Sequence, residues 1–272
     1  MIHQKLSKSG KRSGRRIRGR KRMAFAMIAA ACGLSSGALA SVIKQTVTAT
    51  ARHEPILPHL SSLKIADPIR IIAFGSSSTE GIGASSPLAA YPAQLEAMLQ
   101  GHAGKHSVEV LNRGIGGEDV DDMLRRIKAD ILDKKPDLVI WQTGSNDPMR
   151  NVPIDRFERS TREGIAAIRA AGADVMLMEP QWCPRLEHEQ SAEQFRTVIG
   201  RIGAELDVPV VHRYDLMHAW VDKGFVALDQ LVGPDGLHMT DEGYALLARA
   251  VADQVLAESS LEKTVTPLLA TK

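Results

Sequence analysis

Residues 69–81 read IRIIAFGSSSTEG, an apolar run that stops at a turn of small and hydroxyl-bearing residues. The apolar part, Ile69–Phe74, is typical of a strand that is buried on both faces. Strands of this kind occur in parallel sheets, which helices cover on either side. The turn that follows the strand is then expected at the carboxyl edge of the sheet, where folds of this class bind their ligands.

The rest of the chain repeats this pattern of a short apolar run and a longer amphipathic stretch. Four further strands are predicted at Val108–Leu111, Leu138–Trp141, Val175–Met178 and Val208–Val211. Helices are predicted at Ala90–Gln100, Val120–Leu132, Ile154–Ala171, Ala192–Leu206 and Asp241–Leu256. Alternating strands and helices with short connections predict a single α/β domain over residues 69–258, built on a five-stranded parallel sheet.

The first forty residues have the layout of a secretory signal peptide. Residues 1–22 are rich in Lys and Arg, an apolar run covers Met23–Ala31, and small residues fill Ser36–Ala40. We expect cleavage after Ala40 and a protein that is exported to the periplasm or secreted. The alternative is an uncleaved membrane anchor, although the strictly apolar run is shorter than the ~20 residues that span a bilayer.

The positive net charge of the chain belongs to this leader. The leader holds 10 of the 34 Lys and Arg residues and none of the 32 Asp and Glu residues, so the remainder of the chain is acidic. This distribution argues against a nucleic-acid partner. Residues 41–68 contain three prolines and little periodicity, which predicts a linker or extended arm, and residues 259–272 are expected to form a C-terminal tail.

The chain has two cysteines, Cys32 and Cys183. Cys32 leaves with the leader, so Cys183 has no intramolecular partner and no disulfide framework is expected. The sequence around Cys32 also resembles a lipoprotein attachment site, except that Ala29 stands where Leu is usual.

Chemistry-bearing residues follow three of the predicted strands. Ser77 lies in the first turn, Gly114–Gly117 follows the second strand, and Gly144–Asp147 follows the third. Each turn alone is equally compatible with a plain connection, and the first turn also with a phosphate loop. A phosphate loop requires Gly-Lys-Ser/Thr, and the first turn contains no lysine.

A fourth element, Asp235-Gly236-Leu237-His238, precedes the last predicted helix. A carboxylate three residues before a histidine can hold the imidazole Nδ1–H and leave Nε2 free to take a proton from a hydroxyl. Alone, the pair is also compatible with a capping aspartate and a surface histidine. The order of all four elements along the chain places them at one edge of a parallel sheet.

Together the four elements resemble the SGNH/GDSL hydrolase superfamily. Residues 75–81 are similar to its first block, Gly-Asp-Ser-Leu-Thr-x-Gly, residues 112–117 to its second block, residues 144–147 to its third, and residues 235–238 to its final Asp-x-x-His. The resemblance covers residues 69–256 and implies a flavodoxin-like three-layer α/β/α sandwich. It also implies a catalytic triad of Ser77, Asp235 and His238, and an oxyanion hole formed by the backbone N–H groups of Ser77 and Gly117 and the side-chain amide of Asn146.

The sequence departs from the family pattern at three positions. Ser76 replaces the usual Asp and Ser78 the usual Leu of the first block, and Ser145 replaces a common Gly of the third. Because three serines are adjacent, the nucleophile is identified only by aligning the turn with the flanking motif residues. This alignment selects Ser77. No cofactor or metal site is expected, because His212, Asp215 and His218 match no compact ligand spacing.

These features predict a serine esterase that acts through an acyl-enzyme on Ser77. An O-acyltransferase that uses the same acyl-enzyme and a non-catalytic glycan-binding protein on the same fold are the alternatives, and oligomeric state is left open. The expected partner is a small-molecule or glycan ester with a short, acetyl-type acyl group on a polar alcohol, because no long apolar insertion follows any strand. Trp182, Trp220 and Phe225 weaken that argument, since they are available to line a groove.

Overall fold

The computed structural model describes residues 57–62, 68–103 and 107–259. The chain divides into two compact units, 1–53 and 54–272, and all described residues belong to the second. The predicted signal peptide therefore lies outside the described residues, as does most of the predicted tail. None of the helices in the described ranges has the length and apolar character needed to cross a membrane.

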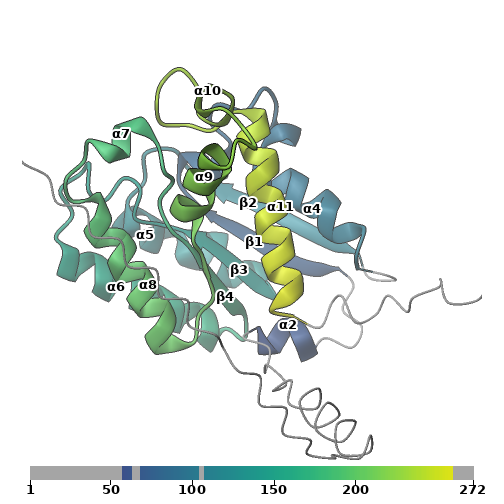
Figure 1. Ribbon diagram of the computed structural model, residues 1–272. Helices are drawn as coiled ribbons and strands as arrows, with labels where there is room; N and C mark the ends of the chain where they lie inside the picture. Colours follow the sequence, from purple (N-terminus) through teal and green to yellow (C-terminus); the bar gives the residue numbers. More distant parts are fainter. Residues whose placement is uncertain (1–56, 63–67, 104–106, 260–272) are drawn as a thin grey trace, which may run out of the picture. The chain divides into compact units, whose positions relative to one another are not determined.

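The described unit is an α/β fold with one five-stranded parallel sheet, as the sequence predicted (Figure 1). The spatial order of the strands is β2-β1-β3-β4-β5, with β1 paired to both β2 and β3. The strands are β1 (Ile69–Gly75), β2 (Val108–Gly114), β3 (Leu138–Gln142), β4 (Asp174–Met178) and β5 (Val210–Val211). The longer helices are α4 (Tyr91–Gln100), α5 (Val120–Asp130), α6 (Ile154–Ala170), α8 (Ala192–Leu206), α9 (Arg213–Asp222) and α11 (Asp241–Ala257). The short helices are α2 (Pro58–Ser62), α3 (Ser77–Glu80), η1 (Pro87–Ala89), η2 (Leu132–Lys134), α7 (Pro184–Glu187) and α10 (Leu228–Leu231).

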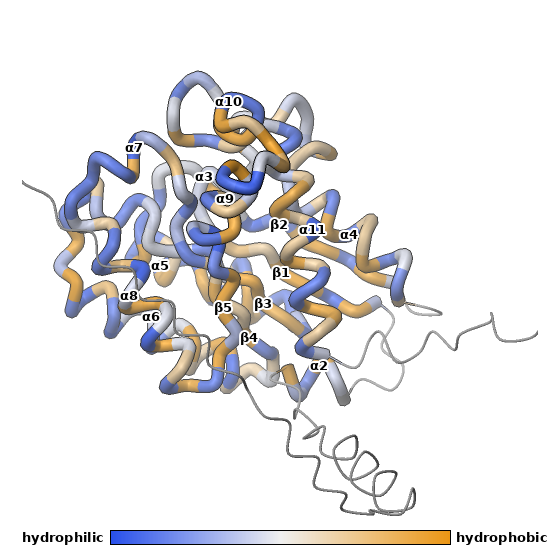
Figure 2. The backbone as a smooth tube through the Cα atoms, in the orientation of Figure 1, coloured by the Kyte–Doolittle hydropathy of each residue, from blue (hydrophilic) through white to orange (hydrophobic). Residues whose placement is uncertain are grey.

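Alternation along the strands divides the interior into two cores. In β1, Ile71 and Ala73 face the core beneath α4, α9 and α11, whereas Ile72 and Phe74 face the core beneath α5, α6 and α8. Successive side chains of a strand point to opposite faces, so an apolar run without polar breaks supplies both cores at once. Figure 2 shows the consequence, with apolar residues concentrated along the central strands and polar residues interspersed along the surrounding helices.

Part of the predicted linker belongs to the fold. Leu57 and Leu60 are buried, and the backbone N–H of Leu60 donates to Asp174 at the start of β4. Proline is well suited to the first turn of a helix, where its missing N–H has no partner to lose, and Pro58 occupies that place in α2. Figure 1 shows α2 at the opposite end of the sheet from α10.

The last strand is shorter than expected. Only Val210 and Val211 pair with β4, whereas the predicted strand began at Val208. The N–H of Val208 instead bonds the carbonyl of Gly203 at the end of α8, and Pro209 has no N–H to give to a ladder.

Two helical glycines provide a matched test of this packing. A Cβ at Gly164 in α6 would lie 2.5 Å from Cζ3 of Trp141, whereas one at Gly200 in α8 would meet nothing within 4 Å. We expect Gly164→Ala to lower the free energy of unfolding by about 1–3 kcal/mol through overpacking. Gly200→Ala should raise it by up to about 1 kcal/mol through helix propensity. Denaturant unfolding of both variants checks this, and a Gly164→Ala protein as stable as Gly200→Ala would contradict the packing.

Candidate active site

Ser77 is the first residue of α3, directly beyond the carboxyl end of β1. It is partly exposed, whereas both neighbouring serines, Ser76 and Ser78, are buried. The turn therefore presents one of its three serine hydroxyl groups to solvent. Ser77 is also the serine that alignment with the family motif selected.

The structure brings Ser77, His238 and Asp235 into one hydrogen-bonded chain. Nε2 of His238 lies 2.9 Å from Oγ of Ser77, and Nδ1 of His238 lies 2.5 Å from Oδ2 of Asp235. The imidazole is largely covered, with 15% of its side chain exposed, whereas the Asp235 side chain is 47% exposed. Such an arrangement can move a proton from the serine hydroxyl to the imidazole.

Asp235 is held as a carboxylate by its own loop. Its Oδ1 accepts the backbone N–H groups of Leu237 and His238 at 2.9 and 3.0 Å. Burial acts to raise the pKa of Asp235, but these two N–H groups and the His238 ring outweigh burial and lower the pKa to about 2. An ionised Asp235 accepts only, so Nδ1 of His238 carries the hydrogen and Nε2 is left to accept from Ser77.

The loop that carries His238 is fixed on both sides. On one side, the N–H of Gly233 donates to the carbonyl of His238 at 2.8 Å. On the other side lies Gly83, which has a φ of +92° and where a Cβ would stand 3.1 Å from Cβ of His238. Glycine at position 83 therefore permits the close approach of the segment after α3 to the histidine.

The two predicted oxyanion-hole loops are bound to each other. Nδ2 of Asn146 donates to the carbonyl of Glu118 at 2.8 Å, and Nη1 of Arg150 donates to the carbonyl of Gly117 at 3.1 Å. Because an amide nitrogen carries two hydrogens, Asn146 retains a second N–H for another acceptor. Gly117 has a φ of +80°, a backbone conformation that favours glycine.

Sequence reasoning missed two charged residues that support these loops. Glu80 Oε2 accepts the N–H of Gly116 at 2.7 Å, which ties α3 to the loop after β2. Arg150 bonds that same loop from the segment after β3. Neither residue carries a sequence signal, because charged residues are common in surface turns and their partners lie far along the chain.

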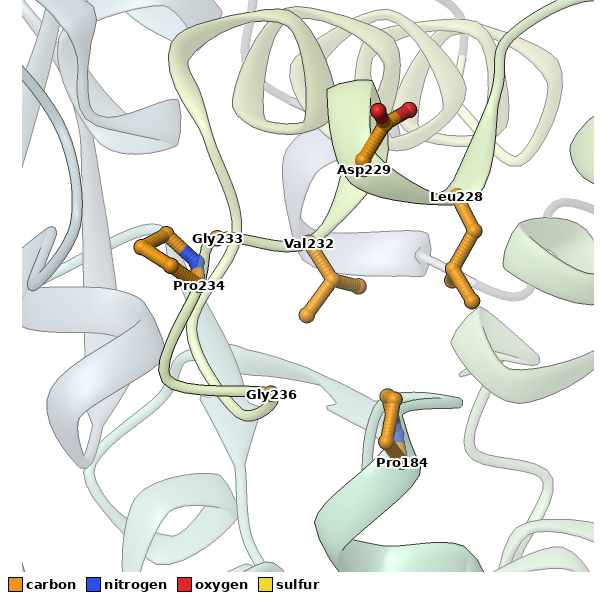
Figure 3. Close-up of a pocket in the computed structure, with 7 residues that line it drawn as sticks. All are labelled: Pro184, Leu228, Asp229, Val232, Gly233, Pro234 and Gly236. Carbon is orange, nitrogen blue, oxygen red and sulfur yellow. The ribbon is translucent and has the colours of Figure 1, made fainter.

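A hollow of about 530 Å³ lies behind the loop of Asp235 (Figure 3). In Figure 3, Leu228 and Val232 point across it toward Pro184, and the carboxylate of Asp229 points away. Its lining includes Pro234 and Gly236, the two neighbours of Asp235, but neither Ser77 nor His238. The hollow is thus separate from the reacting atoms.

The histidines considered as metal ligands have other partners. His212 contacts Glu179 at 3.2 Å, a hydrogen bond that raises the pKa of His212, and His218 contacts Asp222 at 2.9 Å. Within residues 57–62, 68–103 and 107–259, no three His, Cys, Asp or Glu side chains come together as a metal site.

Comparisons with known proteins agree on the family and on the fold. The model of the non-GDSL lipase-like family matches residues 44–260. A Bacillus subtilis lipoprotein is 27% identical over 67% of this chain and 88% of its own length. An acetylxylan esterase of Geobacillus stearothermophilus is 24% identical over 71% of this chain and 96% of its own. The thioesterase 1/protease 1/lysophospholipase L1 of Escherichia coli is 24% identical over 72% and 88%, respectively. Among solved structures, a lipase/acylhydrolase from Enterococcus faecalis superposes with a TM-score of 0.60 at 25% identity, covering 74% of this chain and 99% of that one.

A buried carboxyl beside Asn146 gives the site a pH-dependent stability. Asp147 is wholly buried, and its Oδ1 accepts the N–H of Val120 at 2.9 Å. Burial raises the pKa of Asp147 to about 7, against the opposing effect of that hydrogen bond. Between the unfolded pKa near 4 and about 7, the unfolded state loses this proton and the folded state keeps it, so folding weakens as pH rises.

We expect Asp147→Asn to remove this pH dependence. The amide keeps an acceptor for Val120 and cannot ionise, so the stability of the variant relative to the wild type should increase from pH 4.5 to pH 7.5 by roughly 2–4 kcal/mol. Thermal and denaturant unfolding at several pH values measure the difference, with the exposed Asp253→Asn as the control. A difference that is flat across this range would contradict a neutral, buried Asp147.

Proposed function

The chain belongs to the non-GDSL lipase-like family, and from that premise we propose that it is a serine esterase in which Ser77, His238 and Asp235 are the catalytic triad. The observation that carries the proposal is the continuous hydrogen-bonded chain from Oγ of Ser77 through the imidazole to the Asp235 carboxylate. A nucleophile, a base and a residue that orients the base are all needed for acyl transfer, and binding alone requires none of them.

In the proposed reaction, Oγ of Ser77 attacks the ester carbonyl while Nε2 of His238 takes the hydroxyl proton. The tetrahedral intermediate collapses when the alcohol leaves with that proton, and the acyl group stays on Ser77. Water then attacks the acyl-enzyme with His238 as base and releases the carboxylic acid. Asp235 stabilises the imidazolium that forms in each half of the reaction.

The developing oxyanion would be met by the N–H groups of Ser77 and Gly117 and by the amide of Asn146. Removal of one such donor typically costs ~3 kcal/mol of transition-state stabilisation. The contacts from Glu80 to Gly116 and from Arg150 to Gly117 support this assignment, because they hold the donor loop before substrate arrives. Donors that need not reorganise during the reaction stabilise charge most effectively.

The proposed substrates carry short acyl groups on a carbohydrate or another polar alcohol. Ser77 is partly exposed beside exposed Gly116 and Gly117, and the apolar hollow near Asp235 does not include Ser77 in its lining. An open site of this kind would leave a long acyl tail in water. The acetylxylan esterase relative supports the short-acyl proposal. The relative named as a thioesterase and lysophospholipase suggests the competing possibility to be tested, a substrate with a longer acyl chain. Exposure of Ser77 to water favours hydrolysis over transfer to an acceptor alcohol.

Export is part of the same proposal. The charged start, apolar middle and small-residue end of residues 1–40 support it, and one relative is a lipoprotein. The expected substrate is then an ester outside the cytoplasm.

Labelling with a fluorophosphonate tests the triad directly. Mass spectrometry should place the adduct on Ser77, and Ser77→Ala should abolish labelling, whereas Ser78→Ala, at the buried neighbour, should retain it. We expect His238→Ala to lower kcat by about 10³-fold or more and Asp235→Asn by somewhat less. Labelling of Ser77→Ala at the full rate would exclude Ser77 as nucleophile, and normal turnover by His238→Ala would place the base elsewhere.

Acyl-length preference is measured with p-nitrophenyl esters from acetate to palmitate, kept below micelle-forming concentrations. We expect kcat/KM to be highest between acetate and butyrate. Each buried CH₂ contributes only ~0.8 kcal/mol, so selection for long chains requires an extended apolar lining at Ser77. A maximum at octanoate or longer would refute the short-acyl proposal and leave the esterase assignment intact.

A further inference from the structure

A buried hydrogen-bonded chain begins behind the turn of Ser77. Gln142, the last residue of β3, is wholly buried. Its Oε1 accepts the backbone N–H of Ser76 at 2.9 Å, the hydroxyl of Ser76 at 3.1 Å and the hydroxyl of Thr79 at 3.2 Å. A Cβ at Gly75 would lie 2.7 Å from the same Oε1, so glycine there makes room for the amide. One side chain of the sheet thus holds both ends of the turn.

The same chain continues to the loop of His238. Nε2 of Gln142 donates to Oγ of Ser145 at 3.1 Å, and this hydroxyl donates to Oε1 of Gln181 at 3.1 Å. Nε2 of Gln181 then donates to the carbonyl of Leu237 at 3.3 Å. Leu237 precedes His238, so buried side chains join the segments that carry the two reacting groups.

Arg213 determines the direction of every hydrogen bond in the chain. It is wholly buried, and its Nη2 donates to Oε1 of Gln181 at 2.7 Å. Burial lowers the pKa of Arg213 to about 10, which leaves the guanidinium a cation at neutral pH. A guanidinium can only donate, so Gln181 must present its oxygen to Arg213 and its N–H groups to Leu237.

The remaining directions follow from this one. The hydroxyl of Ser145 must donate to the Gln181 oxygen, and its own oxygen is then available to the N–H group of Gln142. Gln142 therefore presents its carbonyl oxygen to Ser76, whose backbone N–H is a donor only. The two ends of the chain, an N–H at Ser76 and a carbonyl at Leu237, agree with this direction.

The hydroxyl-bearing members of the chain include two of the three departures from the family pattern. Ser76 stands in place of the usual Asp and Ser145 in place of a common Gly. An aspartate at position 76 would oppose the oxygen of Gln142 with a second acceptor, and a glycine at position 145 would interrupt the chain. The two departures are compatible with each other and with Arg213.

We infer that Gln142, Ser145 and Gln181, oriented by Arg213, are positioning residues that set the Ser77–His238 geometry. The inference rests on the proposed function, in which that contact transfers the proton. Hydrogen bonds are electrostatically stronger in a buried, low-dielectric interior than in water, so this chain should hold the groups at its two ends in place. Misplacement of reacting groups by about 1 Å can cost 10²-fold in rate, so a break in this chain should lower turnover more than binding.

The Gln181→Glu variant breaks only the last link. A glutamate accepts from Arg213 and Ser145, as Gln181 does, but has no N–H for the carbonyl of Leu237. The new ion pair with Arg213 should offset much of the repulsion between the carboxylate and the Leu237 carbonyl, so the variant should stay folded with a melting temperature within a few degrees of the wild type. We expect kcat to fall about 10-fold or more with KM within about 3-fold, and the rate of Ser77 phosphonylation to fall in parallel. Loss of activity without loss of stability distinguishes positioning from a structural role.

Ser145→Ala removes the hydroxyl in the middle of the hydrogen-bonded chain and should lower kcat about as much as Gln181→Glu does. Ser145→Thr retains the hydroxyl, so its kcat should lie within about 5-fold of the wild type. The matched control is Ser78→Ala, since Ser78 is buried in the same turn and its hydroxyl has no hydrogen-bond partner in the described structure. Should Ser145→Ala fail to fold, Gln181→Glu decides alone.

Wild-type labelling separates this inference from the proposal on which it rests. If the wild type is not phosphonylated at Ser77, the proposed function fails. If the wild type is labelled at Ser77 and Gln181→Glu retains kcat within about 2-fold, the positioning chain is refuted and the esterase stands. A fall in melting temperature with unchanged kcat in Ser145→Ala would likewise refute it.

Discussion

The parallel direction of all five strands is the constraint on which the site depends. It places the turns after β1, β2 and β3 at one edge of the sheet, so that residues far apart in sequence meet there. Ser77 and His238 are 161 positions apart and lie 2.9 Å from each other between Oγ and Nε2. Backbone pairing fixes the strand ends, and the loops need to place side chains only over the short remaining distance.

Hydrogen bonds join the loops to one another at this edge of the sheet. Arg150 and Asn146, both in the segment after β3, bind the backbone of Gly117 and Glu118, and Glu80 of α3 binds Gly116, so three side chains from two segments converge on one short loop. The same region also carries a cost in folding stability, because the carboxyl of Asp147 is buried where it accepts the backbone N–H of Val120. Retention of a carboxyl where burial raises its pKa to about 7 is the kind of local conflict that functional sites carry.

Sequence reasoning succeeded where a periodic or local signal exists. The buried strands show continuous apolar runs, and the Asp235-x-x-His238 spacing allows a contact within one loop, so the fold and this pair were predictable. It failed for α2, where Pro58 looked like a linker residue and only the burial of Leu60 shows a helix docked on the core. Gln142 and Gln181 could not be identified from the sequence either. The role of each depends on a hydrogen-bond partner more than 30 positions away along the chain, and only the fold brings such partners together.

The buried chain also explains why motif residues here should be considered together and not one at a time. Taken singly, Ser76 and Ser145 weaken the match to the family blocks, and neither position has a chemical role of its own. Arg213, however, gives the chain a fixed direction, and under that direction position 76 must donate to Gln142 while position 145 must both accept and donate. Serine meets both requirements, and aspartate and glycine do not. A site can therefore diverge from a family motif at several positions and keep its geometry, provided that the changes conserve the direction of the hydrogen bonds beneath it.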